Sequence, residues 1–180
     1  MGPNPNERGA CGVFPPYAFI PGGPWPHPTS SPKGHSFGKA GESAPPIEQD
    51  DWANSAHFLR GVALFNAGYY WEAHESWEAL WHAHGRHGST ADVLKGLIKL
   101  AAAGVKVRER QPNGVTTHAR RAADLFESVR AREGRRLLGL DLDRLAAFAR
   151  ETAAAPPADP GGRDDTVVRV FGFLIEPGRT

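Results

Sequence analysis

Several features that usually identify a protein's compartment or chemistry are scarce in this sequence. Cys11 is the only cysteine, which excludes an intrachain disulfide and suits the reducing cytoplasm. No apolar run approaches the roughly 18 residues of a membrane span, and the first residues lack the apolar core of a signal peptide. The charges nearly cancel, at a formal net charge of +1, so the chain as a whole is not drawn to nucleic acid or lipid. We therefore expect a cytoplasmic protein that does not bind membranes.

Proline is nearly absent from the middle of the chain and concentrated at its start. Eleven of the 16 prolines lie in residues 1–50, and Pro112 is the only one between residues 51 and 155. Because proline interrupts helices, this contrast predicts an extended Pro/Gly-rich arm over residues 1–50 and a helical bundle domain over residues 51–155. Residues 156–180 then form a C-terminal extended tail, either a short strand or a strap on the body.

The predicted arm is not uniform. Residues 1–10 have the composition of a disordered tail. Residues 14–37 are too rich in aromatic side chains for a solvated linker. We expect this second stretch to be ordered against the bundle, with Phe19 and Trp25 mostly buried.

Helix signals follow one another across the middle of the chain. Capping residues, apolar spacings of three and four residues, and terminal glycines predict five helices. Short connections between long amphipathic helices favour antiparallel neighbours. The expected fold is all-α, a compact antiparallel bundle of about five helices. The predicted helices run from Asp50 or Asp51 to Gly68, from about Tyr70 to about His84, from Ser89 or Thr90 to about Arg110, from Pro112 to about Arg132, and from Asp141 or Asp143 to a point before Pro156.

The second predicted helix carries the most informative pattern, NAGYYWEAHESWEALW. On a helical wheel, His74 lies at the edge of an apolar stripe and Glu78 lies just beside it, one turn along. Glu72 points away from the stripe, towards the solvated face, and Glu75 is intermediate. Burying an unpaired polar group is costly, so His74 and Glu78 must be paired or functional. The stripe consists of Tyr70, Ala73, Trp77, Leu80 and Trp81.

The spacing of His74 and Glu78 lets both side chains hold one divalent metal ion. Two ligands do not complete such a site, and three histidines elsewhere in the chain are candidates for the remainder. Alternatively, Glu78 orients His74 as a general base, or the pair is structural and satisfies a helix crossing. The candidate metal ligands are His74, Glu78, His118, His27 and His35.

Two lysines of the third predicted helix extend the candidate site. Lys95 and Lys99 lie on one stripe, where they either grip an anionic ligand or form a solvated face that bridges to the second helix. The candidate residues for a small ligand are His74, Glu78, Trp81, Lys95 and Lys99.

Charge is unevenly distributed along the chain. Residues 106–136 are rich in arginine, whereas residues 42–78 are rich in acids. This asymmetry favours complementary packing or self-association into a homo-oligomer. The arginine-rich stretch lacks interleaved aromatic residues, so we do not expect nucleic-acid binding.

Two segments resemble the bacterial and archaeal family called domain of unknown function 309. They are NAGYYWEAHESWEALWHAHG and LKGLIKLAAAGVKVRERQPNGVTTHARRAADLF, and the resemblance covers about residues 52–130. The family is recognised by a His-x-x-x-Glu-x-x-Trp/Tyr pattern, which is His74, Glu78 and Trp81 here. The resemblance implies an all-helical bundle whose function is not established and for which the motif suggests metal binding. Many members carry glutamine where this chain has Lys99, a cation that disfavours a nearby metal and favours pairing with Glu78.

The sequence thus predicts a small helical protein with a metal- or small-ligand-binding site at His74 and Glu78, either hydrolase-like or purely binding. The alternative is a helical protein-interaction or scaffold module, with a protein partner, in which both residues are structural. A pocket lined by His74, Glu78 and a third histidine or carboxylate favours the first function. A dry cluster of His74, Glu78 and Lys99 favours the second.

Overall fold

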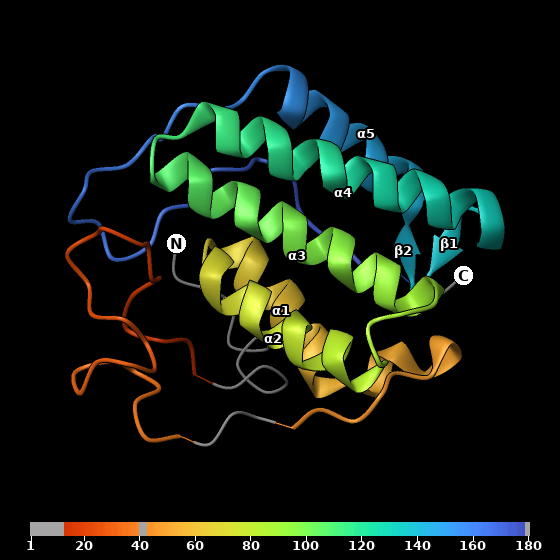
Figure 1. Cartoon of the computed structure of the whole chain (residues 1–180), viewed down its shortest axis with the longest axis horizontal. Helices are drawn as coiled ribbons and strands as arrows, with labels where there is room; N and C mark the ends of the chain where they lie inside the picture. The colour runs from red at the N-terminus through yellow and green to blue at the C-terminus, as the bar shows by residue number, and fades with distance from the viewer. Residues whose placement is uncertain (1–12, 40–42, 179–180) are drawn as a thin grey trace.

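The computed structural model describes residues 13–39 and 43–178, so the tail predicted over residues 1–10 lies outside the described part. Its helices form one bundle in which each α-helix packs mainly on its neighbours in sequence (Figure 1). Only a short antiparallel hairpin departs from helical structure among the described elements, and the predicted all-α bundle is confirmed. No helix in this part combines the length and apolarity needed to cross a membrane. The elements are the 3-10 helix η2 (Gln49–Asn54), the helices α1 (Ala56–Ala67), α2 (Tyr70–Ala83), α3 (Ser89–Arg108), α4 (Pro112–Glu133) and α5 (Leu142–Ala154), and the strands β1 (Arg136–Leu137) and β2 (Leu140–Asp141).

Local chemistry explains where α1 begins and ends. Ser55 caps the helix because its hydroxyl oxygen accepts a hydrogen bond from the Phe58 N–H. The predicted caps Asp50 and Asp51 were wrong: they lie in η2, where Asp51 breaks the helical backbone with φ −110° and ψ 17°. Gly68 ends α1 as predicted, with a φ of 97° that residues with a Cβ rarely adopt.

Trp77 lies at the centre of the core and is fully buried, as predicted. Its indole N–H donates to the Phe58 carbonyl oxygen at 3.3 Å. A Cβ atom at Gly61 would lie 2.2 Å from the indole nitrogen, so α1 and α2 approach closely only because residue 61 is glycine. Trp81, also predicted to be a core residue, is only half-buried. It lies at the rim of the bundle, where the Lys95 ammonium group sits 5.5 Å from its ring centroid.

The arm, defined here as residues 13–39, is ordered against the bundle but is rich in turns rather than extended (Figure 1, red to orange). Phe19 is buried, which confirms the prediction for that residue. Trp25 is only half-buried, contrary to the prediction. The reason is that Trp25 stacks on Tyr17 of the arm itself, with ring centroids 5.5 Å apart, rather than on a helix.

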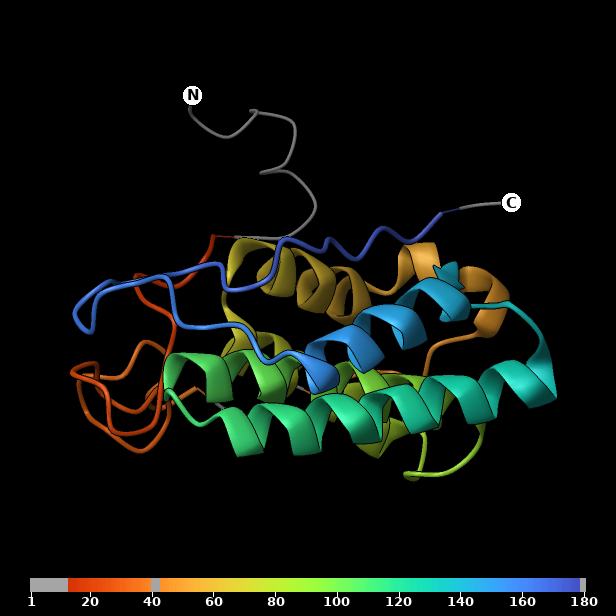
Figure 2. The same cartoon turned by 90° about the horizontal axis from the view of Figure 1, so that it is seen from above.

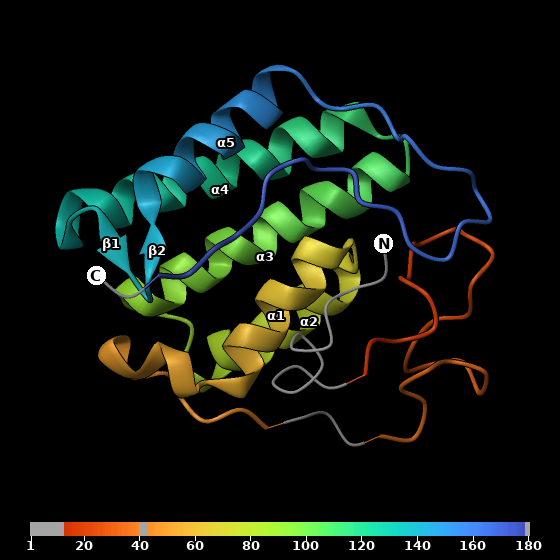
Figure 3. The same cartoon turned by 180° about the vertical axis from the view of Figure 1, so that it is seen from behind.

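The tail, described over residues 156–178, is a strap without regular secondary structure. Figure 3 shows it crossing α3 between α1 and α5 towards the hairpin. Two side chains of the helices hold its backbone: the Asn66 carboxamide exchanges two hydrogen bonds with Ile175, and the Tyr70 hydroxyl accepts the N–H of Val170. Figure 2 shows the tail beside the start of the arm at one end of the bundle, where the Ala18 N–H donates to the Thr166 carbonyl oxygen.

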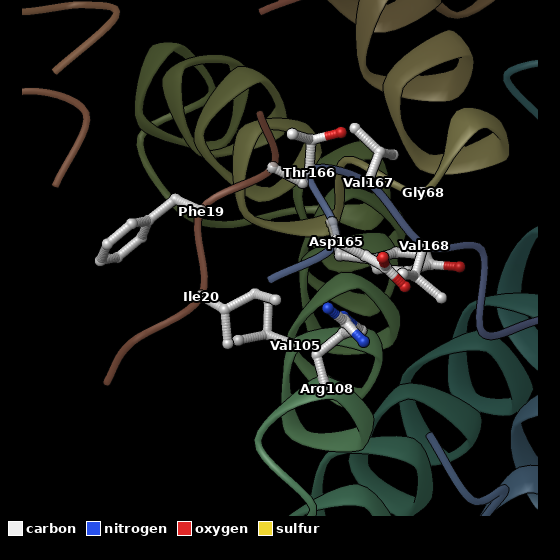
Figure 4. A pocket seen from close by; sticks show the side chains of 11 residues that line it. Phe19, Ile20, Gly68, Val105, Arg108, Asp165, Thr166, Val167 and Val168 are labelled. Carbon is white, nitrogen blue, oxygen red and sulfur yellow. The ribbon is translucent and has the colours of Figure 1, made fainter. Parts of the chain in front are cut away.

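Arg108, the last residue of α3, fastens the tail at this end. Its buried guanidinium pairs with Asp159 at 2.6 Å and donates to the Gly162 carbonyl oxygen at 3.0 Å. Both charged side chains are almost inaccessible, and a buried charge needs such a partner. Figure 4 shows Arg108 pointing into the seam between Ile20 of the arm and the tail. The space left in that seam is about 10 Å³, room for one water at most, so the seam is a packing contact.

Candidate functional site

Helix α2 has three faces, and the arm covers the one that the helical wheel assigns to solvent. The apolar stripe faces the bundle and is buried from Tyr70 to Leu80. A second face, with Glu72 and Glu75, lies under the arm. A third edge, with His74 and Glu78, turns towards α3. The expectation that Glu72 points to solvent was therefore wrong: a wheel locates the face that packs on the bundle, but it has no information about a segment that folds back from elsewhere.

Glu72 of α2 forms buried hydrogen bonds with the arm. Its Oε1 accepts the backbone N–H of Phe19 at 2.9 Å, and His35 Nε2 lies 3.1 Å from the same oxygen. The two side chains are only 6% and 8% exposed. The second oxygen, Oε2, is also buried, and no residue of the described chain donates a hydrogen bond to it. Burying such an acceptor without a donor is costly, so Oε2 is a point at which a ligand donor would be stabilised.

His35 is held in place by the arm. The ring of Tyr17 packs on its imidazole, with centroids 4.8 Å apart, and the Tyr17 hydroxyl oxygen accepts the His35 backbone N–H at 3.3 Å. His35 Nδ1 lies 3.0 Å from the Ser36 hydroxyl oxygen. Because the Glu72 carboxylate accepts, Nε2 carries a proton, and in the neutral ring Nδ1 accepts from the Ser36 hydroxyl. Ser36, His35 and Glu72 thus form one chain of hydrogen bonds.

These residues line a groove of about 420 Å³ between the arm and helices α1 and α2. That volume lies within the range of small-molecule sites. The groove carries charge of both signs on its walls. Besides the hydrogen-bonded chain, the charged groups that line it are Lys39, Arg60, Glu75 and Glu78.

The surroundings of Glu75 in the groove change its ionisation. Burial raises the pKa of Glu75 above its ordinary value of 4.5, and the neighbouring Glu72 raises it further. The indole of Trp71 and the rings of His27 and His35 lower this pKa, but less than the other effects raise it. A cation entering the groove would stabilise the ionised form of Glu75.

The predicted pair of His74 and Glu78 lies at a partly solvated edge. His74 Nε2 and Glu78 Oε2 are 3.9 Å apart, and the side chains are 27% and 42% exposed. Burial lowers the pKa of His74 below 6.5, Glu78 raises it, and Lys99 lowers it again. The imidazole is therefore neutral at physiological pH and interacts only weakly with the carboxylate. Glu78 lines the groove, whereas His74 does not.

Helices α3 and α4 bring further basic groups to this edge. Burial lowers the pKa of Lys99, and the charges of Arg121 and Lys95 lower it as well. Burial and Lys99 lower the pKa of His118, whose buried Nδ1 has no hydrogen-bond partner among the described residues. His74 also lowers the pKa of His118. Of the residues predicted to bind a small ligand, Lys95 and Trp81 contact each other instead, by a cation–π interaction.

The predicted metal ligands are not brought together. Among the residues that the structure describes, no three His, Cys, Asp or Glu side chains are grouped so that they could hold a metal ion. His35 contacts Glu72. His27 caps its own turn, because its Nδ1 accepts the backbone N–H groups of Thr29 and Ser30, each at 3.3 Å.

The fold defines a helical bundle with a groove under its arm, and one comparison relates part of the chain to a known family. Residues 58–117, a third of the chain, match the model of a family described as Domain of unknown function (DUF309). This match confirms the resemblance seen in the sequence. The matched segment includes Glu72, His74 and Glu78, whereas His35 and Ser36 lie outside it. No curated protein matches the chain.

Sequence reasoning missed Ser36 and the role of Glu72. The available signal was weak: a histidine–serine pair in a turn of an unusually aromatic arm, and one more glutamate on a helix that carries three within seven residues. Which glutamate meets which histidine depends on the path of the arm, and no sequence spacing specifies that path.

Proposed function

We propose that the chain binds a small organic molecule bearing an ammonium group in the groove between the arm and α2. The observation that carries the proposal is Oε2 of Glu72, a buried carboxylate oxygen without a donor on a residue that lines the groove. An ammonium group supplies both the hydrogen bond and the positive charge that such an oxygen favours.

The rest of the groove supports a cationic ligand. Burial and Glu72 raise the pKa of Glu75, and the charge of a bound cation would lower it again. Glu78 adds a third carboxylate at the rim. Lys39 and Arg60 also line the groove, and their positive charges repel a cationic ligand. The ammonium group must therefore bind next to the carboxylates.

Calorimetric titration with benzylamine tests the proposal, with benzyl alcohol as the matched neutral compound. We expect the wild-type protein to bind benzylamine in preference to benzyl alcohol. Glu72→Gln and Glu75→Gln should each weaken benzylamine binding by about tenfold, equivalent to about 1.4 kcal/mol. Glu151→Gln, on the exposed face of α5, is the control and should not change the affinity.

Two outcomes of the titration would contradict the proposed binding of an ammonium group. One is equal binding of the amine and the alcohol, and the other is unchanged amine binding in both carboxylate variants. Because Glu72→Gln also alters a buried contact, its helical content must be verified by circular dichroism. If Glu72→Gln does not fold, Glu75→Gln still tests whether a carboxylate of the groove is needed for amine binding.

A protein-interaction role in which His74 and Glu78 are structural is the second candidate. It is favoured by the loose 3.9 Å contact of that pair beside the ammonium group of Lys99. Metal binding at the same pair stays a prediction, which metal analysis of protein purified without a histidine tag would test. Cytoplasmic location and self-association likewise stay predictions.

A further inference from the structure

We infer that Ser36 is a nucleophile, activated by His35 and Glu72, that cleaves small carboxylic esters in the groove. The inference rests on the proposed function of the groove as a ligand site. It adds a reaction to that site and assigns the reaction to residues of the arm.

The hydrogen-bonded chain has the order that nucleophilic catalysis needs. The Ser36 hydroxyl oxygen lies 3.0 Å from His35 Nδ1, and His35 Nε2 lies 3.1 Å from Glu72 Oε1. A serine hydroxyl is a weak nucleophile until a base accepts its proton. The third group fixes the tautomer of the base and stabilises the imidazolium that forms. Glu72 can do both, since the Phe19 N–H holds the same carboxylate oxygen in place.

The backbone that carries Ser36 is rigidly built. The Ser36 N–H donates to the Pro28 carbonyl oxygen at 3.0 Å, which closes the turn. A Cβ atom at Gly34 would lie 2.2 Å from the carbonyl oxygens of both His27 and Pro28, so only glycine permits this turn. A catalytic group must be held near its productive geometry by its supporting residues, and the turn supplies that support.

The other hydroxyl groups of the groove lack this arrangement. The Ser76 hydroxyl donates to the His57 carbonyl oxygen at 3.0 Å, which is not a base. The Thr29 hydroxyl oxygen lies 3.4 Å from His27 Nδ1, but that nitrogen already accepts two backbone N–H groups. Among the described groove residues, Ser36 alone combines a hydroxyl group with a base whose other nitrogen is bound to a carboxylate.

The reaction proceeds in two balanced steps. The Ser36 oxygen bonds to the ester carbonyl carbon while its proton passes to His35 Nδ1. The tetrahedral oxyanion then collapses, the bond to the leaving alcohol breaks, and that alcohol takes the proton from His35. Water attacks the acyl-serine in the same way, giving the carboxylic acid and free Ser36. Lys39, whose N–H donates to the Ser36 carbonyl oxygen and whose side chain lines the groove, supplies positive charge for the oxyanion.

The test uses the full chain with p-nitrophenyl acetate and diisopropyl fluorophosphate. We expect release of p-nitrophenolate and an adduct on the peptide that contains Ser36. Ser36→Ala should reduce the release to the background rate, and His35→Gln should reduce it by about 10²–10⁴-fold, the usual contribution of a general base. Ser30→Ala, an exposed serine of the same turn, is the control and should not change the rate.

An adduct confined to other residues, or an unchanged rate in Ser36→Ala, would overturn the inference. Benzylamine titration of Ser36→Ala separates this result from the proposed function. If the wild type binds benzylamine but forms no adduct, Ser36 is not a nucleophile, and the proposed ligand site stands. If Ser36 forms an adduct but benzylamine does not bind, the groove does not bind an ammonium group, and the assignment of Ser36 as a nucleophile stands.

Discussion

A carboxylate as deeply buried as that of Glu72 is stable only where donors compensate for its lost hydration. The compensation here comes from two arm residues, Phe19 and His35, more than thirty residues away in sequence. Local sequence around Glu72 therefore gives no sign of its environment. The same contact makes the arm and α2 depend on one another, and this dependence can be measured.

Removal of the imidazole from His35 should strongly destabilise the protein. His35→Ala leaves Glu72 with one donor fewer in a buried position, and loss of a hydrogen bond to a charged group costs about 1.5–3 kcal/mol. Chemical denaturation measures this as a lower midpoint at an unchanged slope. His87→Ala, at an exposed position after α2, should remain within about 0.5 kcal/mol of the wild type. Equal midpoints for the two variants would show that the buried contact contributes nothing.

Glu75→Gln should stabilise the protein at neutral pH. The folded state raises the pKa of this carboxyl above 4.5, so the wild type loses stability as the pH rises from 4.5 through the raised value. Glutamine has no such charge, and its advantage should disappear below pH 4.5. Denaturation midpoints at pH 4 and pH 7 measure the difference. A variant that is less stable than the wild type at pH 7 would contradict the raised pKa.

Glu78→Gln distinguishes a binding role from a structural role for the predicted pair. A metal on His74 and Glu78 requires the carboxylate, so the variant should then lose bound metal and keep its midpoint. If the pair is structural, the midpoint should fall by a few tenths of a kcal/mol, as for exposed ion pairs, and no affinity should change. The loose contact at 3.9 Å favours the structural result. Loss of metal from purified protein would contradict it.

At the scale of the elements, the bundle was predictable because its signals are local. The apolar spacing of α2, the proline that opens α4 and the glycine that ends α1 all act within a few residues of their positions. The first cap was misplaced because Asp51 and Ser55 both suit a helix start, and the backbone leaves helical geometry at Asp51, so that α1 begins only after Ser55. The hairpin of β1 and β2 gave no detectable signal, since each strand has only two residues.

The interface of α1 and α2 should be the most sensitive part of the bundle. Trp77→Ala removes a fully buried indole and should cost about 3–5 kcal/mol, as other large aromatic truncations do. Gly61→Ala should also destabilise, because its Cβ would overlap the same ring. Denaturant midpoints of both variants measure these losses. A wild-type midpoint in either would show that the helices do not cross at this point.

At the scale of the whole molecule, the arm adds a groove to the helical bundle, between itself and the helices α1 and α2. Aromatic content indicated that the arm is ordered, and Phe19 bears this out. The groove itself was beyond prediction, because it arises where the turns of the arm meet a face of α2 that has no apolar pattern. The sequence predicted a site at His74 and Glu78 because helical spacing identifies neighbours only within one helix. It does not show that residues of the arm lie next to α2.

Stability should also depend on pH through histidines held neutral by the fold. Burial lowers the pKa values of His74, His84 and His118, so their contribution is present above pH 6.5 and is lost as the pH falls through the lowered values. For His118, the charges of Lys99, Lys106 and Arg121 and the ring of His74 act in the same direction. The midpoint of His118→Asn should therefore fall less between pH 7.5 and pH 5.5 than the wild-type midpoint. An equal fall in both proteins would show that His118 does not titrate differently on folding.

The central claim is that the groove under the arm, rather than the edge with His74 and Lys99, is the ligand site. Nuclear magnetic resonance titration of the isotope-labelled full chain with benzylamine tests it most directly, because every backbone amide reports its own surroundings. The account predicts saturable shifts at the amides of Phe19, His35, Glu72 and Glu75. Shifts centred on Lys99 and His118, or no saturable shift at all, would contradict it.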